Sequence, residues 1–240
     1  MTEKEMRPSE GSLAEPVFVP MGDRGLLMEL STTINPEINQ KIRALCDSLS
    51  VCAPMGVLEV IPTYRSLIIS YDPVTASLED LKRYLLALNQ RMADVEAREP
   101  NVVEVPVCYG GEFGEDLGYV AKHNGLTEAE VIKIHSGTDY PVYMLGFTPG
   151  FPYLGGLSEK VHTPRLATPR TKVPAGSVGI ANNQTGIYPI ESPGGWQLIG
   201  RSPLKLFDLN RPNPFYFKAG DFLRFMPITP EAFRALEERG

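Results

Sequence analysis

The sequence predicts an α+β protein with two domains: a ferredoxin-like α/β sandwich followed by a small β-barrel. Three observations predict this fold class. The chain has 240 residues, enough for two modest domains that each bury a core. Strand-like and helix-like segments alternate through the first hundred or so residues, and from residue 138 onward the chain is rich in Gly, Pro and β-forming residues. We expect a disordered leader over 1–15, the sandwich over 16–100, the barrel over 101–229 and a C-terminal helix over 230–240.

The first half is predicted to follow the order β-α-β-β-α-β of a split βαβ sandwich, with both helices on one face of the sheet. Asn35 is placed to cap a helix that starts at Pro36, and Ser77 is placed to cap a second helix. Each helix carries an apolar stripe that is expected to pack in the core: Ile38, Ile42, Leu45 and Leu49 in the first, and Leu78, Leu81, Leu85 and Leu88 in the second. The strands are expected at 26–30, 56–61, 66–71 and 102–109.

The second half opens with two short helices and continues as short strands. One helix lies within 114–125 and stops at an Asn-Gly pair, and the next begins at Thr127, which forms a capping box with Glu130. The strand-like runs are 140–147, 176–181, 185–190, 196–200 and 222–226. Their short lengths and frequent turn residues favour a small barrel. Thr229 and Pro230 then start a short charged helix on the surface.

The composition and the absence of known motifs exclude several classes of protein and of functional site. No apolar run approaches the roughly 20 residues that cross a bilayer, and the first fifteen residues lack the apolar core of a secretion signal. A net charge of −6 argues against nucleic acid. The three cysteines, Cys46, Cys52 and Cys108, lack metal-ligand spacing and are expected to be reduced, buried thiols without a metal site. The sequence contains no phosphate-binding P-loop, GxSxG elbow, HExxH pair or GxGxxG motif.

Cationic and polar residues cluster in two stretches of the second half. Arg165, Arg170 and Lys172 lie within eight positions of a proline-rich segment, where fixed cations suit a carboxylate or phosphate; solvated or ion-paired surface charges are the alternative. His135 ends a predicted helix, so it is a general acid or base, a substrate contact, or a cation that stabilises the helix C-terminus. The candidate orienting groups further on are Gln184, Tyr188 and Ser192.

Aromatic residues occupy segments that are poor in regular hydrogen bonding. The stretch GFTPGFPYLGGL, residues 146–157, places Phe147, Phe151 and Tyr153 between prolines and glycines. Trp196, the only tryptophan, follows two glycines. These four rings either line a groove or partner face, or pack in the core, because aromatic residues dominate both environments.

Three stretches carry a resemblance to a known family. HSGTDYPVYML (135–145), GFTPGFPYLGGL (146–157) and the long segment from TPRTKVPAG to QLIGRSP (168–203) resemble the signature of the 5-oxoprolinase B-subunit family. That family is also known through a sporulation-kinase inhibitor and allophanate hydrolase subunit 1. The resemblance covers residues from about 16 to 229. It implies a ferredoxin-like domain, a cyclophilin-like β-barrel and a cytoplasmic bacterial protein.

The resemblance implies the B subunit of an ATP-dependent enzyme that opens 5-oxo-L-proline to L-glutamate, working with an A subunit and with a C subunit that is a homologous barrel. The isolated chain is then expected to be inactive, and the location of the ATP site is left open. In this function Arg165, Arg170 and Lys172 face anions, and His135 is an acid/base or substrate contact. The alternatives are an inhibitor that docks on a histidine kinase through the aromatic face, and an allophanate hydrolase-type protein that acts in urea or amide degradation. A prolyl isomerase would rest on fold analogy alone.

Overall fold

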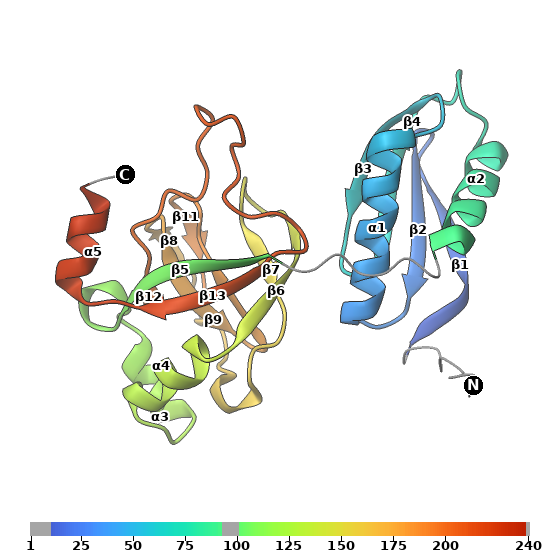
Figure 1. Ribbon diagram of the computed structural model, residues 1–240. Helices are drawn as coiled ribbons and strands as arrows, with labels where there is room; N and C mark the ends of the chain where they lie inside the picture. Colours follow the sequence, from blue (N-terminus) through green and yellow to red (C-terminus); the bar gives the residue numbers. More distant parts are fainter. Residues whose placement is uncertain (1–10, 93–100, 239–240) are drawn as a thin grey trace, which may run out of the picture. The chain divides into compact units, whose positions relative to one another are not determined.

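The structure is a computed structural model that describes residues 11–92 and 101–238. The chain forms two compact units, Met1–Glu99 and Pro100–Gly240 (Figure 1). The expected leader over residues 1–15 lies largely outside the described residues. Its last part does not fit that expectation, since residues 12–15 already belong to a strand.

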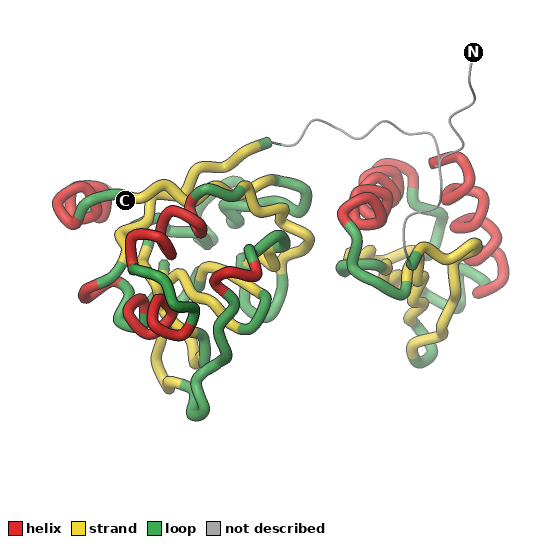
Figure 2. Tube along the Cα trace, turned by 90° about the horizontal axis from the view of Figure 1, so that it is seen from below, coloured by secondary structure: helices red, strands yellow, loops and turns green. Residues whose placement is uncertain are grey.

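The first unit is a four-stranded antiparallel sheet with two helices. Its elements are β1 (Ser12–Met21), β2 (Gly25–Ser31), α1 (Pro36–Cys52), β3 (Val57–Pro62), β4 (Ser66–Tyr71) and α2 (Leu78–Arg91). The strands lie in the order β1-β2-β4-β3. Figure 2 shows α1 and α2 together on one side of these strands. The sheet therefore has one face covered by helices.

Both helices of this unit start at the predicted capping residues. The Asn35 side chain accepts a hydrogen bond from the Glu37 amide at 2.8 Å, and the Ser77 hydroxyl accepts one from the Asp80 amide at 3.1 Å. The predicted stripes face the sheet, where alternate residues of β2 and β4 complete the core. This core contains Leu26, Met28, Leu30, Ile38, Ile42, Leu45, Leu49, Leu67, Ile69, Leu81, Leu85 and Leu88.

The predicted order β-α-β-β-α-β is wrong in its last strand. The first unit has the order β-β-α-β-β-α, because its fourth strand is β1 at the beginning of the chain. Residues 102–109 do form a strand, but that strand belongs to the sheet of the second unit. An alternating apolar pattern identifies a strand without identifying its neighbours, since those are fixed by long-range packing.

The second unit is built on a seven-stranded, barrel-like sheet with the order β10-β9-β12-β5-β13-β6-β7. The strands of this sheet are β5 (Val102–Tyr109), β6 (Asp139–Leu145), β7 (Pro152–Leu154), β9 (Ser177–Ala181), β10 (Gln184–Ile187), β12 (Gln197–Arg201) and β13 (Phe222–Pro227). Neighbours are antiparallel except β5 and β13, which run parallel. The two edge strands, β10 and β7, lie against each other. The sheet is therefore nearly closed.

A smaller two-stranded sheet and several helices surround the barrel. The small sheet pairs β8 (Arg170–Val173) with β11 (Ser192–Gly194). The helices are η2 (Gly111–Phe113), α3 (Leu117–His123), α4 (Glu128–Ser136), η3 (Glu159–Val161) and α5 (Pro230–Glu237), η denoting a short 3-10 turn. Phe233 of α5 is buried against Phe113 at a ring distance of 4.6 Å. The guanidinium of Arg201 lies over both rings, at 5.2 and 5.3 Å, so a cation–π contact fastens α5 to the barrel.

Three observations bear on the classes considered above. Across 11–92 and 101–238, none of the helices has the length and apolarity that a bilayer crossing requires. Over the same residues, His, Cys, Asp and Glu side chains do not form groups that could hold a metal ion. All three cysteines are free thiols; Cys108 is buried, but Cys52 is exposed, contrary to expectation, because it ends α1 at the surface.

Candidate functional site

Five aromatic side chains of the second unit form a cluster around Phe151, called the aromatic cluster below. The Phe151 ring lies 5.8 Å from Phe147, 5.5 Å from Tyr153, 5.7 Å from Tyr188 and 5.7 Å from Trp196, in edge-to-face arrangements. Phe151, Tyr188 and Trp196 are buried, whereas Tyr153 is half-buried and Phe147 is exposed. The cluster thus joins core packing to the surface through one continuous series of rings.

Phe147 is held in an unfavourable conformation at the surface. Its backbone φ is +64°, in the left-handed region that bulky residues rarely occupy, and its side chain is 69% exposed. The loop around it is closed by main-chain hydrogen bonds: Gly146 N to Phe151 O at 3.1 Å, and Phe151 N to Thr148 O at 3.1 Å. Strain of this kind costs about 1–3 kcal/mol and concentrates at functional positions. Neither the strain nor the exposure contributes to stability within this chain.

Arg165 is an exposed cation beside the buried rings. Its guanidinium lies 5.9 Å from the centroid of the Trp196 ring, within cation–π range. The preceding carbonyl, that of Pro164, accepts a hydrogen bond from Gln197 Nε2 at 2.8 Å, so the loop that carries Arg165 is tied to β12. Burial raises the pKa of the Tyr188 hydroxyl, and the positive charge of Arg165 partly offsets this rise.

Arg170 holds three segments together. Its guanidinium donates to both carboxylate oxygens of Asp116, at 2.9 and 2.8 Å, to Glu115 at 2.8 Å and to the Trp196 carbonyl at 3.2 Å. Asp116 also accepts a hydrogen bond from the Leu198 amide at 2.7 Å. The arginine charge is therefore matched by two carboxylates of its own chain. The expectation that Arg170 faces an external anion is not supported by this geometry.

The remaining predicted polar residues lie apart from one another. Lys172 forms a 3.0 Å ion pair with Glu191, and both side chains are more than half exposed, so the pair contributes little. Gln184 begins β10, opposite Ala181 of β9. The Ser192 hydroxyl on β11 is enclosed, and no described residue hydrogen-bonds to it. Among the orienting groups predicted from the sequence, Ser192 thus retains unused hydrogen-bonding capacity.

His135 lies inside the second unit, fully enclosed. Its Nδ1 is 2.8 Å from the Tyr109 hydroxyl and its Nε2 is 2.8 Å from the Thr185 hydroxyl. Thr185 donates its own hydrogen to the Gly179 carbonyl, so it accepts from Nε2–H while Tyr109 donates to Nδ1. The ring is stacked on Phe225 at 4.6 Å. Burial lowers the pKa of the imidazole to about 3, which keeps it neutral.

This environment does not suit the acid/base role that the sequence suggested for His135. Both ring nitrogens are occupied, and the exposed fraction of the side chain is zero. A substrate would have to displace Tyr109 or Thr185 to reach it. The position at the end of α4 misled the prediction, because a histidine in a last helical turn is commonly exposed and satisfies the helix carbonyls.

The structure therefore brings together part of the predicted set. Arg165, Tyr188 and the other rings of the aromatic cluster are neighbours, with Arg170 attached through the Trp196 carbonyl. His135 belongs to a different buried group. Sequence reasoning missed Asp116, although an acidic residue immediately before a helix is a recognisable capping position.

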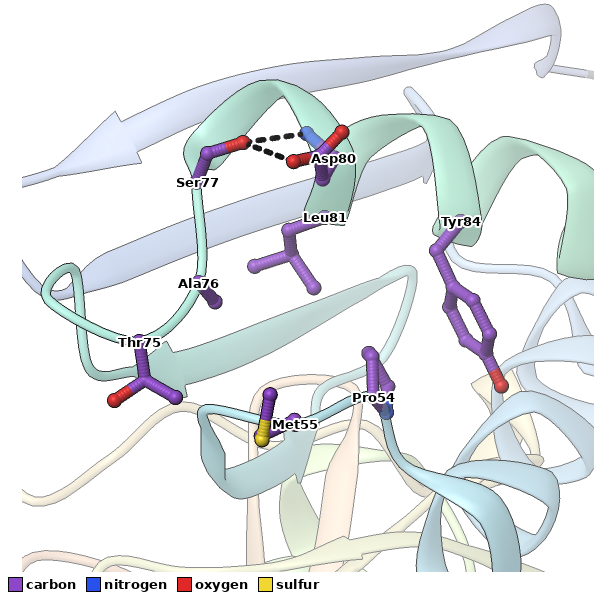
Figure 3. A pocket seen from close by; sticks show the side chains of 8 residues that line it. All are labelled: Pro54, Met55, Thr75, Ala76, Ser77, Asp80, Leu81 and Tyr84. Carbon is purple, nitrogen blue, oxygen red and sulfur yellow. Dashed lines mark hydrogen bonds between the residues drawn. The ribbon is translucent and has the colours of Figure 1, made fainter.

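A cavity of about 260 Å³ lies in the first unit, whereas every site residue predicted from the sequence lies in the second (Figure 3). Its lining contains one carboxylate, Asp80, and no lysine or arginine.

The class of protein follows from a family model that matches most of the chain. The family model described as carboxyltransferase domain, subdomain C and D, matches residues 16–217. The chain belongs to the 5-oxoprolinase B-subunit family: it is 42% identical over 231 residues to the 5-oxoprolinase B subunit of Bacillus subtilis, with 91% of this chain and 95% of that protein covered.

Solved structures agree with the fold. A crystal structure of TTHA0988 is 38% identical and superposes with a TM-score of 0.76, covering 85% of this chain and 40% of that chain. The protein thus spans less than half the length of that relative. The urea amidolyase of K. lactis superposes with a TM-score of 0.72 over 93% of this chain and 15% of its own length. At 21% identity, this second likeness concerns the fold alone.

Proposed function

We propose that the protein is the B subunit of an ATP-dependent 5-oxoprolinase, which converts 5-oxo-L-proline, ATP and water to L-glutamate, ADP and phosphate. It acts in the bacterial cytoplasm with an A subunit and with a C subunit that is a homologous barrel. The observation that carries this proposal is the 42% identity to a 5-oxoprolinase B subunit over 95% of that protein's length.

Arg165 is the residue of this chain best placed to bind the substrate carboxylate. It is exposed, it is oriented beside the Trp196 ring, and the structure gives it no carboxylate partner among the described residues. An arginine suits a planar carboxylate because its fork donates two parallel hydrogen bonds. Ser192, with its unsatisfied hydroxyl, and Tyr188 are the accompanying polar groups. Lys172, which is already paired with Glu191, and Gln184, which begins β10, are not assigned a contact to the substrate.

The catalytic acid or base and the ATP site are proposed to come from another polypeptide of the complex. His135 is enclosed, and Arg170 is already paired with Asp116 and Glu115. The lining of the cavity in the first unit contains no lysine or arginine, and the cavity is smaller than the roughly 300–1,000 Å³ typical of ligand pockets. ATP supplies the activation that makes a lactam carbonyl susceptible to water. The isolated chain is then inactive.

The aromatic cluster is proposed as the face that meets a partner. Phe147 is an exposed, conformationally fixed ring that contacts Phe151, and Phe151 in turn packs against Tyr153 and Trp196. Rigid aromatic side chains of this kind dominate binding energy at protein interfaces.

The same face favours a second candidate function, that of a protein inhibitor of a histidine kinase. Such a role needs a docking surface and no catalytic residue, which agrees with the enclosed His135 and the neutralised Arg170. A role in an allophanate hydrolase is less favoured, because the urea amidolyase likeness is distant.

The strand order of the first unit supports a finer fold assignment. Moving β1 from the start of this unit to its end would turn the observed order into β-α-β-β-α-β, so we infer a circularly permuted ferredoxin-like sandwich. For the second unit we infer a cyclophilin-like barrel.

Co-expression with candidate A and C subunits from the same genome tests the function. The purified mixture is expected to release glutamate from 5-oxoproline only with ATP and only when this chain is present. An inert complete mixture, together with suppression of kinase autophosphorylation by the single chain, would replace the enzyme role with the inhibitor role.

A further inference from the structure

Arg165 lies on a segment that is fastened immediately before and immediately after it. The Pro164 carbonyl accepts a hydrogen bond from Gln197 Nε2 at 2.8 Å. The Leu166 amide donates to the Gly195 carbonyl, also at 2.8 Å. Both bonds lead to residues that flank the tryptophan ring beside the guanidinium. The segment that carries the cation is therefore joined to the segment that carries the ring.

A further anchor lies two residues before Arg165. Thr163 and Asn182 exchange two main-chain hydrogen bonds, one from the Asn182 amide at 2.7 Å and one from the Thr163 amide at 3.3 Å. Asn182 directly follows β9, so this pair ties the segment to a strand of the barrel. Hydrogen bonds thus hold residues 163, 164 and 166, and Arg165 lies among them.

The stretch 195–198, to which this segment is joined, is itself braced. The Trp196 carbonyl accepts a hydrogen bond from Arg170 at 3.2 Å, and the Leu198 amide donates to Asp116 at 2.7 Å. Arg170 and Asp116 are bonded to each other, so the main chain at both positions is tied to one partly buried ion pair. The support of the Arg165 segment is therefore fixed by contacts of its own.

Gln197 is buried, and its amide group is only half used. The side chain is 2% exposed; its Nε2 donates to the Pro164 carbonyl, whereas no described residue donates to its Oε1. A buried oxygen without a partner destabilises a fold, and an apolar side chain of similar shape would avoid that cost. Core packing therefore does not explain a glutamine at this position. The contribution that an apolar residue could not make is the hydrogen bond that fixes Pro164, next to Arg165.

We propose that Gln197 is a positioning residue, which orients Arg165 beside the Trp196 ring so that the guanidinium can receive a substrate carboxylate. An exposed arginine loses rotamer freedom when it binds a ligand, and a segment that is already fixed reduces this loss. Orientation also matters because two parallel hydrogen bonds require the guanidinium to lie in the plane of the carboxylate. The inference rests on the function proposed above, which assigns Arg165 to the substrate carboxylate.

Gln197→Met tests this role, because methionine keeps the length of the side chain and lacks the donor. In the assembled enzyme this variant should raise the KM for 5-oxoproline about fivefold and change kcat by less than about twofold. In the Arg165→Gln background it should leave KM unchanged, since no guanidinium remains to be oriented. The melting temperature should change by less than about 4 °C, because the lost hydrogen bond is offset by removal of the unpaired oxygen.

Leu223→Ala is the control for stability. Leu223 is fully buried on β13, so its truncation should lower the melting temperature while KM stays within about twofold of the parent value. A residue that only supports the fold, as Leu223 does, changes stability without changing KM. The opposite behaviour of Gln197→Met would therefore separate positioning from packing.

Trp196 provides a readout that does not need an active enzyme, because it is the only tryptophan of the chain. Quenching of its fluorescence by acrylamide should increase in Arg165→Gln, since the guanidinium no longer covers the ring. Gln197→Met should increase the quenching to a similar extent. The double variant should show no further increase, because both substitutions remove the same cover.

The outcomes distinguish this inference from the proposed function. A raised KM in Arg165→Gln, beside unchanged KM and unchanged quenching in Gln197→Met, would overturn the inference and leave the function standing. An unchanged KM in Arg165→Gln would refute the substrate contact, and quenching would then decide whether Gln197 orients the guanidinium. An equal rise in KM with and without Arg165 would also contradict the positioning role. If Gln197→Met does not fold, Gln197→Asn decides, because its amide is one CH₂ group too short to reach Pro164.

Discussion

The Nη2 atom of Arg170 donates to both carboxylate oxygens of Asp116, at 2.9 and 2.8 Å, although 54 residues separate the two residues in the chain. The pair connects the start of α3 to β8, and Asp116 also accepts from the amide of Leu198 on β12. Three segments around the aromatic cluster therefore depend on one carboxylate.

Asp116→Asn is expected to lower the free energy of unfolding by about 3 kcal/mol, because it leaves a partly buried arginine charge with a weaker partner. The matched control is Glu115→Gln. Glu115 contacts the same guanidinium but is 61% exposed, so the expected loss is under about 1 kcal/mol. Urea denaturation measures the free energy of unfolding of both variants. Equal losses in the two variants would contradict the assignment of Asp116 as the principal partner.

His135 is expected to make stability depend on pH. Its folded pKa of about 3 lies below the unfolded value of 6.5, so the unfolded chain binds more protons between these values. The contribution is fully present above pH 6.5 and is lost as pH falls toward 3. Between pH 7.5 and pH 5 this residue alone should reduce the free energy of unfolding by about 2 kcal/mol.

The variant His135→Gln separates this effect from other titrating groups. It should be less stable than the parent at pH 7.5, since Tyr109 and Thr185 lose an ideal partner, but its stability should decline less on acidification. Thermal or urea unfolding at several pH values gives the slope of the free energy of unfolding against pH for the parent and for the variant. Parallel slopes for parent and variant would mean that the imidazole is not held neutral.

Phe147→Gly should separate folding from assembly. Glycine adopts a φ of +64° without strain, so the free energy of unfolding should stay the same or rise by up to about 1 kcal/mol. Loss of the ring should weaken binding to the partner proteins by about 30-fold, as for an interface hot spot. Leu209→Ala, at another residue that is 77% exposed, is the control and should leave assembly intact. Undiminished assembly of Phe147→Gly would remove the proposed partner face.

Arg165→Gln should raise the KM for 5-oxoproline in the assembled enzyme by about tenfold with little change in kcat, because it removes a charged contact to the substrate carboxylate. Lys172→Gln, at a residue already paired with Glu191, should alter KM by less than about twofold. Steady-state glutamate release is the measurement. A large effect of Lys172→Gln and none of Arg165→Gln would reverse the assignment.

Local signals in the sequence predicted the helices well. Asn35, Ser77, Thr127 and Thr229 all occupy capping positions in the structure, because a side-chain oxygen beside free amides acts within a few residues. Pairing between strands was less predictable. The pattern of residues 102–109 indicated a strand, but its neighbours β12 and β13 lie far along the chain.

In the candidate site too, residue types could be predicted from local sequence, but their partners and exposure could not. The aromatic residues were recognisable from composition, yet their exposures differ widely, from 3% for Phe151 to 69% for Phe147, because the fold of one loop decides them. The sequence left Arg170 as either an anion-binding or an ion-paired residue, because nothing in its local sequence identifies Asp116 as its partner. His135 looked accessible for a similar reason, because the residues that enclose it come from other elements.

The parallel pairing of β5 with β13 has a consequence for synthesis of the chain. β5 opens the second unit, but one of its two neighbours in the sheet is supplied by residues 222–227, more than 110 residues further along the chain. During translation β5 therefore keeps an unsatisfied edge until residues 222–227 have emerged, which slows folding and favours aggregation of nascent fragments. A chain that stops before residue 222 should yield insoluble material.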